Sequence, residues 1–396
     1  MAIENWVAQH VDELTEFRRD LHRNPELLYD VERTAARVAE ALEAAGCDEV
    51  HRGIGRTGVV GVIRGQQSTS GRAIGLRADM DALPIVETSD KPWSSTIPGK
   101  MHACGHDGHT TMLLGAAKGL AESRGFDGTV YLFFQPAEEG GAGAKAMIDD
   151  GLFERFPVDE VYGIHNKPGL PIGQFAVPPK AVMGSVDEIT ITIEGKGGHA
   201  AFPHLTTDPI VVTSALVQAV QSIVSRTVDP RQSAVVSITT IHAGDAFNVI
   251  APAVRLNGTV RTLDEEVRND VERRLQRMVE HIAEAFEARG TLDYVRHYPP
   301  TVNHPEQASH AVEAAVTVAG AERVDPDYDS SMGGEDFAFM LLEKPGAFLF
   351  VGNGDTPACH HPAYDFDDEA IAWGCSFWTT LVRQRLPIGE GARKAA

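Results

Sequence analysis

The segment Val186-Asp-Glu-Ile-Thr-Ile-Thr-Ile-Glu194 marks a change of pattern in the middle of the chain. Isoleucines alternate with polar side chains in it, so a strand there would carry the isoleucines on one face and the threonines on the other. Such alternation is typical of a sheet with one buried and one solvated face. The apolar runs before this segment are short and continuous, as in strands buried on both faces. A second kind of domain is therefore predicted to begin here.

The residues after this strand predict a complete small domain. Asp208-Pro209 supplies an N-cap followed by proline at the first helical position. Thr262 and Glu265 have the spacing of a capping box. The expected elements are a helix at 209–226, strands at 234–241 and 254–261, a helix at 262–289 and a strand at 292–297. This β-α-β-β-α-β order is the ferredoxin-like split motif, and it would occupy residues 184–297.

On both sides of this small domain, predicted helices alternate with short buried strands, which indicates an α/β architecture. The expected helices lie at 6–22, 32–45, 110–120, 310–319 and 336–342, and the expected strands at 58–63, 74–78, 129–134, 158–164 and 347–351. A chain of 396 residues exceeds what one hydrophobic core usually serves. We therefore predict a discontinuous main domain, residues 1–183 and 298–396, with the small domain inserted into it.

Composition excludes several classes of protein. Lys and Arg number 35 and Asp and Glu 56, so the formal net charge is 35 − 56 = −21. A surface this acidic repels phosphate backbones, which argues against a nucleic-acid partner. No run approaches the roughly 18 apolar residues of a membrane helix, and the N-terminus lacks the pattern of a signal peptide. We expect a cytoplasmic protein without a membrane partner, whose four cysteines are reduced.

The segment Met101-His-Ala-Cys-Gly-His-Asp-Gly-His109 places three histidines, a cysteine and an aspartate just before a predicted helix. Cys104 and His106 are two residues apart on a glycine-containing turn, so both side chains can point at one ion. A thiolate and an imidazole suit zinc and other borderline transition metals. The segment therefore predicts a metal site.

The segment Phe134-Gln-Pro-Ala-Glu-Glu-Gly-Gly141 directly follows a predicted strand. Ligands gather at the carboxyl ends of strands in open α/β sheets. Two adjacent glutamates can divide the work, because one can bind a metal while the other acts as a general base. Pro136 and the two glycines favour a turn that lets both side chains serve one site.

Three other segments carry metal-binding residue types near strand ends. The candidates are His165 after the strand at 158–164, His360 or His361 near the C-terminus, and Asp79 and Asp81 after the strand at 74–78. The two aspartates are either ligands or groups that orient a ligating histidine. Five such clusters at predicted strand ends indicate one metal centre rather than separate accidents.

In this order, these residues resemble the co-catalytic metallopeptidase family that includes aminoacylases. The resemblance is specific for its amidohydrolase branch, which comprises hippurate hydrolases, bacterial N-acyl amino acid amidohydrolases and plant auxin-conjugate hydrolases. It spans nearly the whole chain, through the segments Arg18–Glu26, Leu76–Pro84, His102–His109, Gln135–Gly140, Gly195–Ala201, Phe247–Pro252, Gly333–Phe337 and His360–Phe366.

The resemblance implies a two-metal, peptidase-like catalytic domain, with a mixed sheet flanked by helices, and an inserted lid domain. It implies two divalent ions per subunit, zinc or alternatively manganese, cobalt or nickel, bound by Cys104, His106, Glu139, His165 and His360. The branch pattern His-x-Pro-x-Tyr-Asp-Phe favours His360 over its neighbour as the ligand.

The resemblance also implies roles for residues that do not bind metal. Glu138 falls on the general base and Asp81 on an acidic residue that steers a metal ligand. His199 of the lid falls on a residue that stabilises the tetrahedral intermediate, and Asn248 and Gly334 fall near the substrate. The implied reaction is hydrolysis of the amide bond of a small N-acyl amino acid. An edge strand of the lid favours a homo-oligomer, a dimer or a tetramer.

Three alternatives compete with this interpretation. A dipeptidase or carboxypeptidase would use the same scaffold and chemistry on another acyl group. A thiol amidase would use Cys104 as its nucleophile, but the sequence offers no adjacent Lys–Glu arrangement to activate it. A binding protein with a structural metal would have no need of a base such as Glu138 beside the ligand Glu139.

Overall fold

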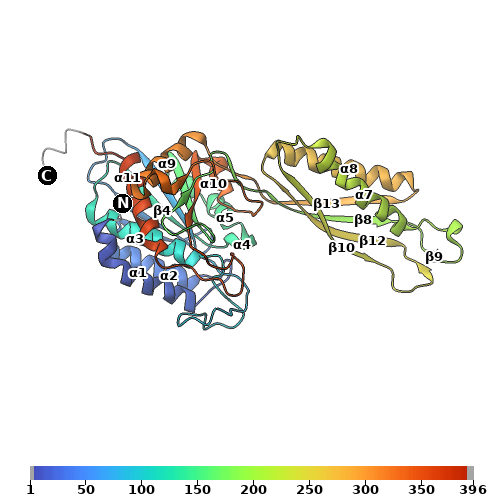
Figure 1. The fold of residues 1–396 in the computed structure, drawn as a ribbon, viewed down its shortest axis with the longest axis horizontal. Coiled ribbons are helices and arrows are strands. Elements are labelled where there is room, and N and C mark those ends of the chain that lie inside the picture. The colour runs from blue at the N-terminus through green and yellow to red at the C-terminus, as the bar shows by residue number, and fades with distance from the viewer. Residues whose placement is uncertain (1–3, 390–396) are drawn as a thin grey trace. The chain divides into compact units, whose positions relative to one another are not determined.

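The computed structural model describes residues 4–389, and the chain divides into two compact units (Figure 1). The large unit comprises Met1–Val182, Val302–Asp329 and Asp336–Ala396, and the small unit comprises Met183–Thr301 and Ser330–Glu335. The last of these segments differs from the predicted division, which placed it in the main domain. It joins the small unit because the amide of Gly184 donates to the carbonyl of Gly333 at 2.8 Å.

The large unit is built on an eight-stranded mixed sheet within the described residues, in the order β1-β2-β4-β3-β5-β16-β6-β15. Four adjacent strands of its centre, β4, β3, β5 and β16, run parallel, and β2 and β1 join them antiparallel at one side. The strands are β1 (Glu49–Ile54), β2 (Gly58–Arg64), β3 (Ala73–Asp79), β4 (Thr129–Gln135), β5 (Glu160–Lys167), β6 (Phe175–Ala176), β15 (Val324–Asp325) and β16 (Gly346–Gly352).

Helices cover the sheet because its strands are apolar on both faces. Val130, Leu132 and Phe134 of β4 join a core with the long helices, whereas Tyr131 and Phe133 contact aromatic rings near the short helix α6 on the other face. The helices are α1 (Asn5–Arg23), α2 (Glu32–Ala45), α3 (His106–Ser123), α4 (Glu138–Gly141), α5 (Gly143–Asp149), α6 (Leu152–Arg155), α9 (Pro305–Ala319), the 3-10 helix η2 (Ala321–Arg323), α10 (Ala338–Glu343) and α11 (Ala370–Arg385). The α/β class predicted from the sequence is confirmed.

The small unit has the predicted β-α-β-β-α-β order, and its four main strands pair antiparallel in the order β10-β12-β8-β13. Ile189, Ile191 and Ile193 of β8 are buried against both helices, as their alternation predicts. The elements are β8 (Val186–Glu194), α7 (Pro209–Thr227), β10 (Ala234–Ala243), β12 (Ala253–Thr262), α8 (Glu265–Ala285) and β13 (Arg289–Tyr298), with shorter pieces β9 (Gly198–His199), η1 (Pro203–Leu205) and β11 (Val249–Ile250). The short strands β7 (Ala181–Met183) and β14 (Thr301–Val302) include the points where the chain passes from one unit to the other.

The second helix of the small unit differs from its prediction at both ends. Its N-cap is Asp264, whose carboxylate accepts from the amides of Glu266 and Val267, so the expected capping box from Thr262 is wrong. The helix ends at Ala285 rather than near 289, because Arg289 already pairs with β8. The carboxylate forms the cap because it reaches two free amides of the first turn at once.

One helix, α7, is long and apolar enough to cross a membrane by length and composition alone, with a mean hydropathy of 1.2. Its buried side chains Val212, Leu216, Val220 and Ile223 belong to the core of the small unit. A helix that packs on a sheet in this way passes the same test, so α7 is weak evidence for a membrane.

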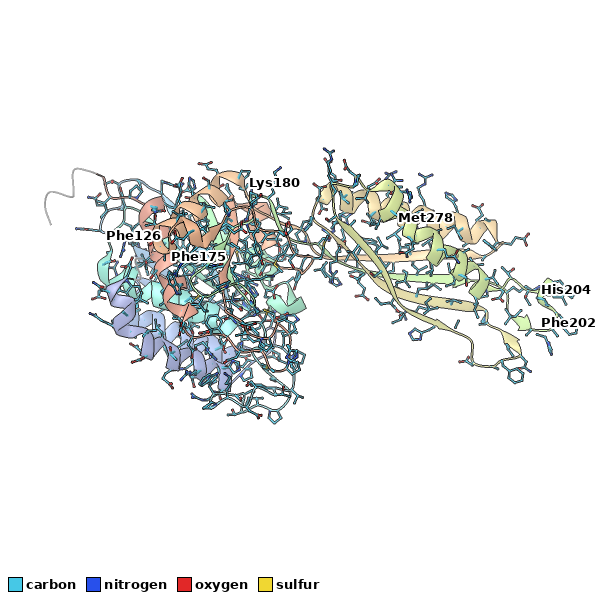
Figure 2. All side chains as sticks on the ribbon, viewed as in Figure 1. Phe126, Phe175, Lys180, Phe202, His204 and Met278 are labelled. Carbon is cyan, nitrogen blue, oxygen red and sulfur yellow. The ribbon has the colours of Figure 1, made fainter. Side chains whose placement is uncertain are left out.

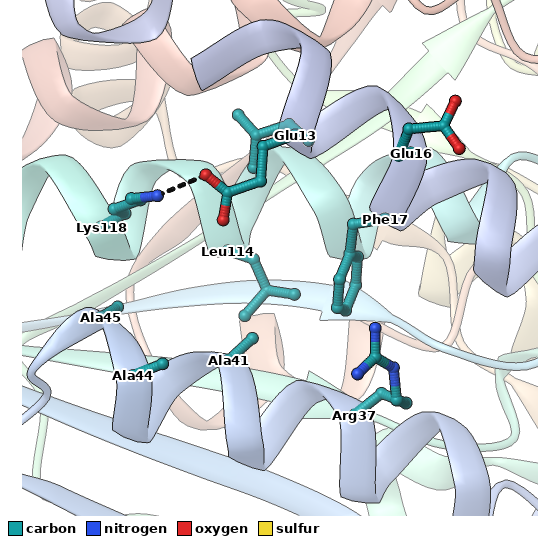
Figure 3. A pocket seen from close by; sticks show the side chains of 10 residues that line it. Glu13, Glu16, Phe17, Arg37, Ala41, Ala44, Ala45, Leu114 and Lys118 are labelled. Atoms are coloured by element: carbon teal, nitrogen blue, oxygen red, sulfur yellow. Dashed lines mark hydrogen bonds and ion pairs between the residues drawn. The ribbon is translucent and has the colours of Figure 1, made fainter. Parts of the chain in front are cut away.

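A groove with a cavity volume of about 330 Å³ lies between α1, α2 and α3 (Figure 3). Leu114 and Phe17 line it, and the ion pair between Lys118 and Glu13 crosses one side with an N–O distance of 2.6 Å. None of the residues that the sequence predicts for the metal centre is among its lining residues.

The small unit contains a buried ion pair that we expect to stabilise it. Asp187 on β8 is fully buried, pairs with Arg268 of α8 and accepts a hydrogen bond from the Tyr294 hydroxyl at 2.7 Å. Arg268→Met would leave this carboxylate buried without its cation, so the free energy of unfolding should fall by about 3–5 kcal/mol. Urea denaturation of the full chain measures the change.

The matched control is Arg231→Met, which breaks an exposed pair with Asp229 in the same unit. Such pairs contribute between about 0 and 1 kcal/mol. Equal effects of the two variants would show that burial does not strengthen the Asp187 pair.

Candidate metal centre

The candidate residues of the large unit lie at one edge of its sheet, where the parallel strands end. Asp79 is the last residue of β3 and Asp81 follows it, Glu138 and Glu139 follow β4, and His165 lies near the end of β5. Parallel pairing aligns the carboxyl ends of neighbouring strands, so side chains that are far apart in sequence meet there. The turn before α3 and the loop after β16 add the remaining candidates.

The turn that carries Cys104 and His106 requires glycine between them. Gly105 has φ = 95°, a left-handed conformation that glycine adopts without steric cost. A Cβ at this position would lie 2.2 Å from Asn166 Nδ2 and 2.5 Å from the Tyr364 hydroxyl. The close approach places Cys104 and the first residue of α3, His106, on the same side of the turn. The predicted start of this helix, at 110, is therefore one turn too late.

Five groups of potential ligands occur within the described residues, each with its ligand atoms within 4.8 Å of one another, and two of these groups contain Cys104. The first group is Cys104, His106 and His165, with Cys104 Sγ 3.4 Å from His165 Nε2. The second is Cys104, Glu139 and His360, with His360 Nε2 3.3 Å from Glu139 Oε1. Cys104 is common to both groups, and together the two groups contain the five predicted ligands.

The chemistry of these side chains fits divalent cations. Both ring nitrogens of His106 and Oε1 of Glu139 are buried without a hydrogen-bond partner, which is costly unless another group binds them. Burial alone would lower the pKa of His106, but the nearby carboxylates Asp79, Asp81 and Glu139 raise it to about 10. This excess of negative charge is what bound cations would offset.

His165 is held in the form that a metal needs. Its Nδ1 lies 2.6 Å from the carbonyl oxygen of Asn166, so the proton belongs on Nδ1 and the lone pair on Nε2. Burial keeps the pKa of His165 well below its usual value. A neutral imidazole with Nε2 facing Cys104 is the arrangement found in ligating histidines.

Asp81 contacts both the turn that carries Glu138 and Glu139 and the ring of His106. Its carboxylate accepts from the backbone amides of Glu138 at 2.9 Å and Glu139 at 3.1 Å, and its Oδ1 lies 3.4 Å from His106 Nδ1. It therefore holds the turn that carries both glutamates, while it faces a candidate ligand. Burial raises the pKa of Asp81. We interpret Asp81 as a group that positions others, in line with the role that the resemblance implies.

His109 and Asp79 form a further potential ligand group with His106, but both nitrogens of His109 already contact protein atoms. His109 Nδ1 lies 2.7 Å from Asp79 Oδ1, and its Nε2 accepts from the backbone amide of Asn166 at 2.9 Å. Both nitrogens of His109 are thus engaged by the protein. Asn166 also donates to the carbonyl of Cys104 at 2.6 Å and accepts from the Tyr364 hydroxyl at 2.8 Å.

Local pattern does not predict a role for Asn166 or Tyr364. The available signals are that Asn166 follows His165 and that Tyr364 lies within the pattern after His360. Asn166 contacts Cys104, and Tyr364 contacts Asn166, across about 60 and 200 residues of sequence.

The structure separates the two adjacent histidines of the C-terminal motif. His360 faces Glu139, whereas His361 Nδ1 accepts from the amide of Ala363 at 3.0 Å and belongs to neither ligand group. His360 has φ = 68°, an uncommon conformation for a residue other than glycine. This backbone turn gives the two neighbours different directions.

The remaining predicted residues lie in the small unit. His199 in β9 pairs with Val249 of β11, and Asn248 accepts from the amide of Ala200 at 3.0 Å, so the structure brings His199 and Asn248 together. Both belong to an exposed end of this unit, where Figure 2 labels Phe202 and His204. Gly334 lies elsewhere in the small unit, packed on Val186.

The position of Asp81 leads to a test of the metal centre. Asp81→Asn keeps the size of the side chain. It weakens the hydrogen bonds that the side chain accepts from two backbone amides, and it weakens the interaction with His106. Loss of such a supporting group commonly lowers metal affinity about 10–100-fold. Isothermal titration of the metal-free protein with zinc measures the affinity.

The control for this experiment is Asp90→Asn, an exposed carboxylate in the loop after the same strand. It should leave zinc affinity unchanged. If Asp81→Asn also binds zinc as tightly as the unaltered protein, Asp81 has no positioning role.

Comparison with known proteins shows the family of the chain. Residues 75–384 match the model of "Peptidase family M20/M25/M40". The chain is 42% identical to a hippurate hydrolase of Campylobacter jejuni over 94% of its own length and 97% of that protein. It is 40% identical to thermostable carboxypeptidase 2 of Saccharolobus solfataricus, with coverage of 91% and 89%. A solved dinuclear metal-binding peptidase of Bacillus subtilis superposes with a TM-score of 0.85 at 34% identity, over 96% and 99% of the two chains.

The chain therefore belongs to peptidase family M20/M25/M40, as an amidohydrolase.

Proposed function

We propose that this amidohydrolase cleaves the amide bond of N-acyl amino acids and releases a carboxylic acid and a free amino acid. The observation that carries the proposal is the place of Glu138. One of its carboxylate oxygens lies within 4.8 Å of potential ligand atoms of His106 and Glu139. A general base beside metal ligands supports hydrolysis, since a purely structural site has no use for one.

Two divalent cations would be held by the two ligand groups described above, with the Cys104 sulfur available to both. When bound, such cations polarise a carbonyl and make a water acidic enough to serve as a nucleophile near neutral pH. Zinc suits the donors sulfur, nitrogen and carboxylate oxygen, and manganese, cobalt and nickel are compatible with them.

In this mechanism Glu138 moves the protons. Its carboxylate accepts a proton from the attacking water and returns it to the nitrogen of the departing amine. Asp81 holds the Glu138 backbone through its amide, so the base stays beside the ligands. Only 7% of Glu138 is exposed, which limits competition from solvent water.

Residues of the small unit would complete the site. We propose that this unit acts as a lid and that the imidazole of His199 donates to the oxyanion that develops on the substrate carbonyl. Asn248, adjacent to His199, and Gly334 would contact the substrate. His199 would reach the substrate either from its own subunit or from a neighbour in a homo-oligomer paired through the lid.

The substrate class is supported by the similarity to a hippurate hydrolase over nearly the full length of both chains. Hippurate is an N-acyl amino acid, and its hydrolysis needs the same chemistry. Similarity to a carboxypeptidase supports a second candidate, cleavage of the C-terminal residue from a peptide. A small soluble substrate and a cytoplasmic location remain part of the proposal.

Loss of the general base and loss of a metal ligand should impair the enzyme in different ways. Glu138→Gln should keep the metal content but lose turnover by a factor of about 10²–10⁴, because the amide cannot accept the proton. Cys104→Ala should instead lower the metal content, because a shared ligand is missing. Metal analysis and initial rates on the same preparations separate the two.

Two results would contradict this assignment. Near-normal turnover of Glu138→Gln would exclude it as the base, and unchanged metal stoichiometry in Cys104→Ala would remove Cys104 from the ligands. Glu154→Gln, which alters an exposed glutamate of α6, is the control and should change neither quantity.

A substrate panel tests the function itself. With the zinc-loaded enzyme, kcat/KM should be higher for hippurate and N-acetyl amino acids than for unblocked dipeptides and N-blocked peptides. A chelator should abolish the activity, and added zinc or manganese should restore it. Preference for peptides would favour the carboxypeptidase alternative, and activity that survives chelation but not alkylation would favour a Cys104 nucleophile.

A further inference from the structure

We propose that Cys104 and Cys359 form a reversible redox pair, so that oxidation to a disulfide withdraws the sulfur from the metal centre and releases the metal. Cys359 has no role in the proposed hydrolysis. The inference rests on the proposed function in one respect, the role of Cys104 as a ligand.

The thiol of Cys359 lies close to the backbone of Cys104. Cys359 Sγ lies 3.8 Å from the carbonyl oxygen of Cys104. The backbone reinforces this contact, because the amide of His360 donates to the carbonyl of Ala103 at 2.7 Å. This bond joins the backbone next to Cys104 to the backbone next to Cys359, and a disulfide tolerates a Cα separation of up to about 7 Å.

The two cysteines differ in access. Cys104 is 8% exposed and packed at the start of α3, whereas Cys359 is partly exposed in a loop whose neighbours Pro357, Ala358 and His360 are exposed. A small oxidant would therefore meet Cys359 first. A loop with few buried side chains can also adjust to the geometry of a disulfide at low cost.

The other two cysteines have different surroundings. Cys375 is buried in α11, and its thiol donates to the carbonyl of Met112 at 3.3 Å. Cys47 follows α2 and packs against the main core. Neither is among the groups of potential metal ligands, so each offers a comparison for a thiol outside the centre.

The chemistry balances with a hydroperoxide as oxidant. The Cys359 sulfur attacks one oxygen of hydrogen peroxide, the O–O bond breaks, and a sulfenic acid and one water form. The Cys104 sulfur then attacks the sulfenic sulfur and displaces the second oxygen as water. The two sulfurs lose two electrons and the peroxide gains them. The Cys359 thiol supplies one proton for the two waters, and solvent supplies the other because metal-bound Cys104 is a thiolate. A dithiol reductant reverses the change.

Disulfide formation would affect both metal positions. The thiolate is the form of cysteine that binds metal, and a disulfide sulfur carries no such charge. Since Cys104 belongs to both ligand groups, its loss leaves each group without one donor. The pair therefore couples the metal content of the centre to the redox state around it.

The experiment uses the full chain, reduced and loaded with zinc. After addition of hydrogen peroxide, zinc release is followed with a chromogenic chelator, and peptide mass mapping looks for a Cys104–Cys359 link lighter by two hydrogen atoms. We expect release together with the link, and recovery of zinc binding after dithiothreitol and fresh zinc. Cys359→Ser should keep its zinc, with release at least about tenfold slower, because the thiol that reacts first with peroxide is missing and no disulfide can form. Cys47→Ser is the control and should behave like the unaltered protein.

The proposal is overturned if Cys359→Ser releases zinc as fast as the unaltered protein, or if mapping finds no Cys104–Cys359 link. Failure of the proposed function is distinguishable from this, because it appears before any oxidant is added, as reduced protein that binds no zinc. In that event, peroxide treatment of the metal-free protein still decides whether the two cysteines pair.

Discussion

Parallel pairing of β4, β3, β5 and β16 is the constraint on which the rest of the centre depends. It aligns four carboxyl ends at one edge of the sheet, and the chain leaves each strand there through residues that can bind a cation or move a proton. The predominantly apolar sides of these strands are buried under helices, so the polar groups converge at the edge. A single sheet register thus brings together residues that span about 280 positions of the sequence.

A second layer of contacts makes this convergence specific. Asp81 holds the amides of Glu138 and Glu139, and Asn166 holds the turn at Cys104. These supporting groups are buried and hydrogen-bonded, so they resist the repulsion among the carboxylates of the centre. The unpartnered nitrogens of His106 are the exception, and they are the atoms that a cation would engage.

The use of a cysteine as a shared metal ligand would also make the centre sensitive to oxidants. The Cys104 sulfur belongs to two ligand groups, and the thiol of Cys359 lies 3.8 Å from the carbonyl oxygen of the same residue. An aspartate at the position of Cys104 would bind cations without any sensitivity to oxidants. The thiol therefore makes the metal content of this chain depend on its redox surroundings, if the pair acts as we propose.

The sequence by itself determined the two kinds of sheet, because alternation in Val186–Glu194 and continuous apolar runs elsewhere report directly on which faces are buried. It also predicted Cys104, His106 and the Glu138–Glu139 pair as site residues, because their residue types and spacing carry chemical meaning locally. Only the tertiary structure decided which groups support them. Asn166, Tyr364 and Cys359 act through contacts between distant segments, and such contacts follow from strand register and helix packing, which no local pattern encodes.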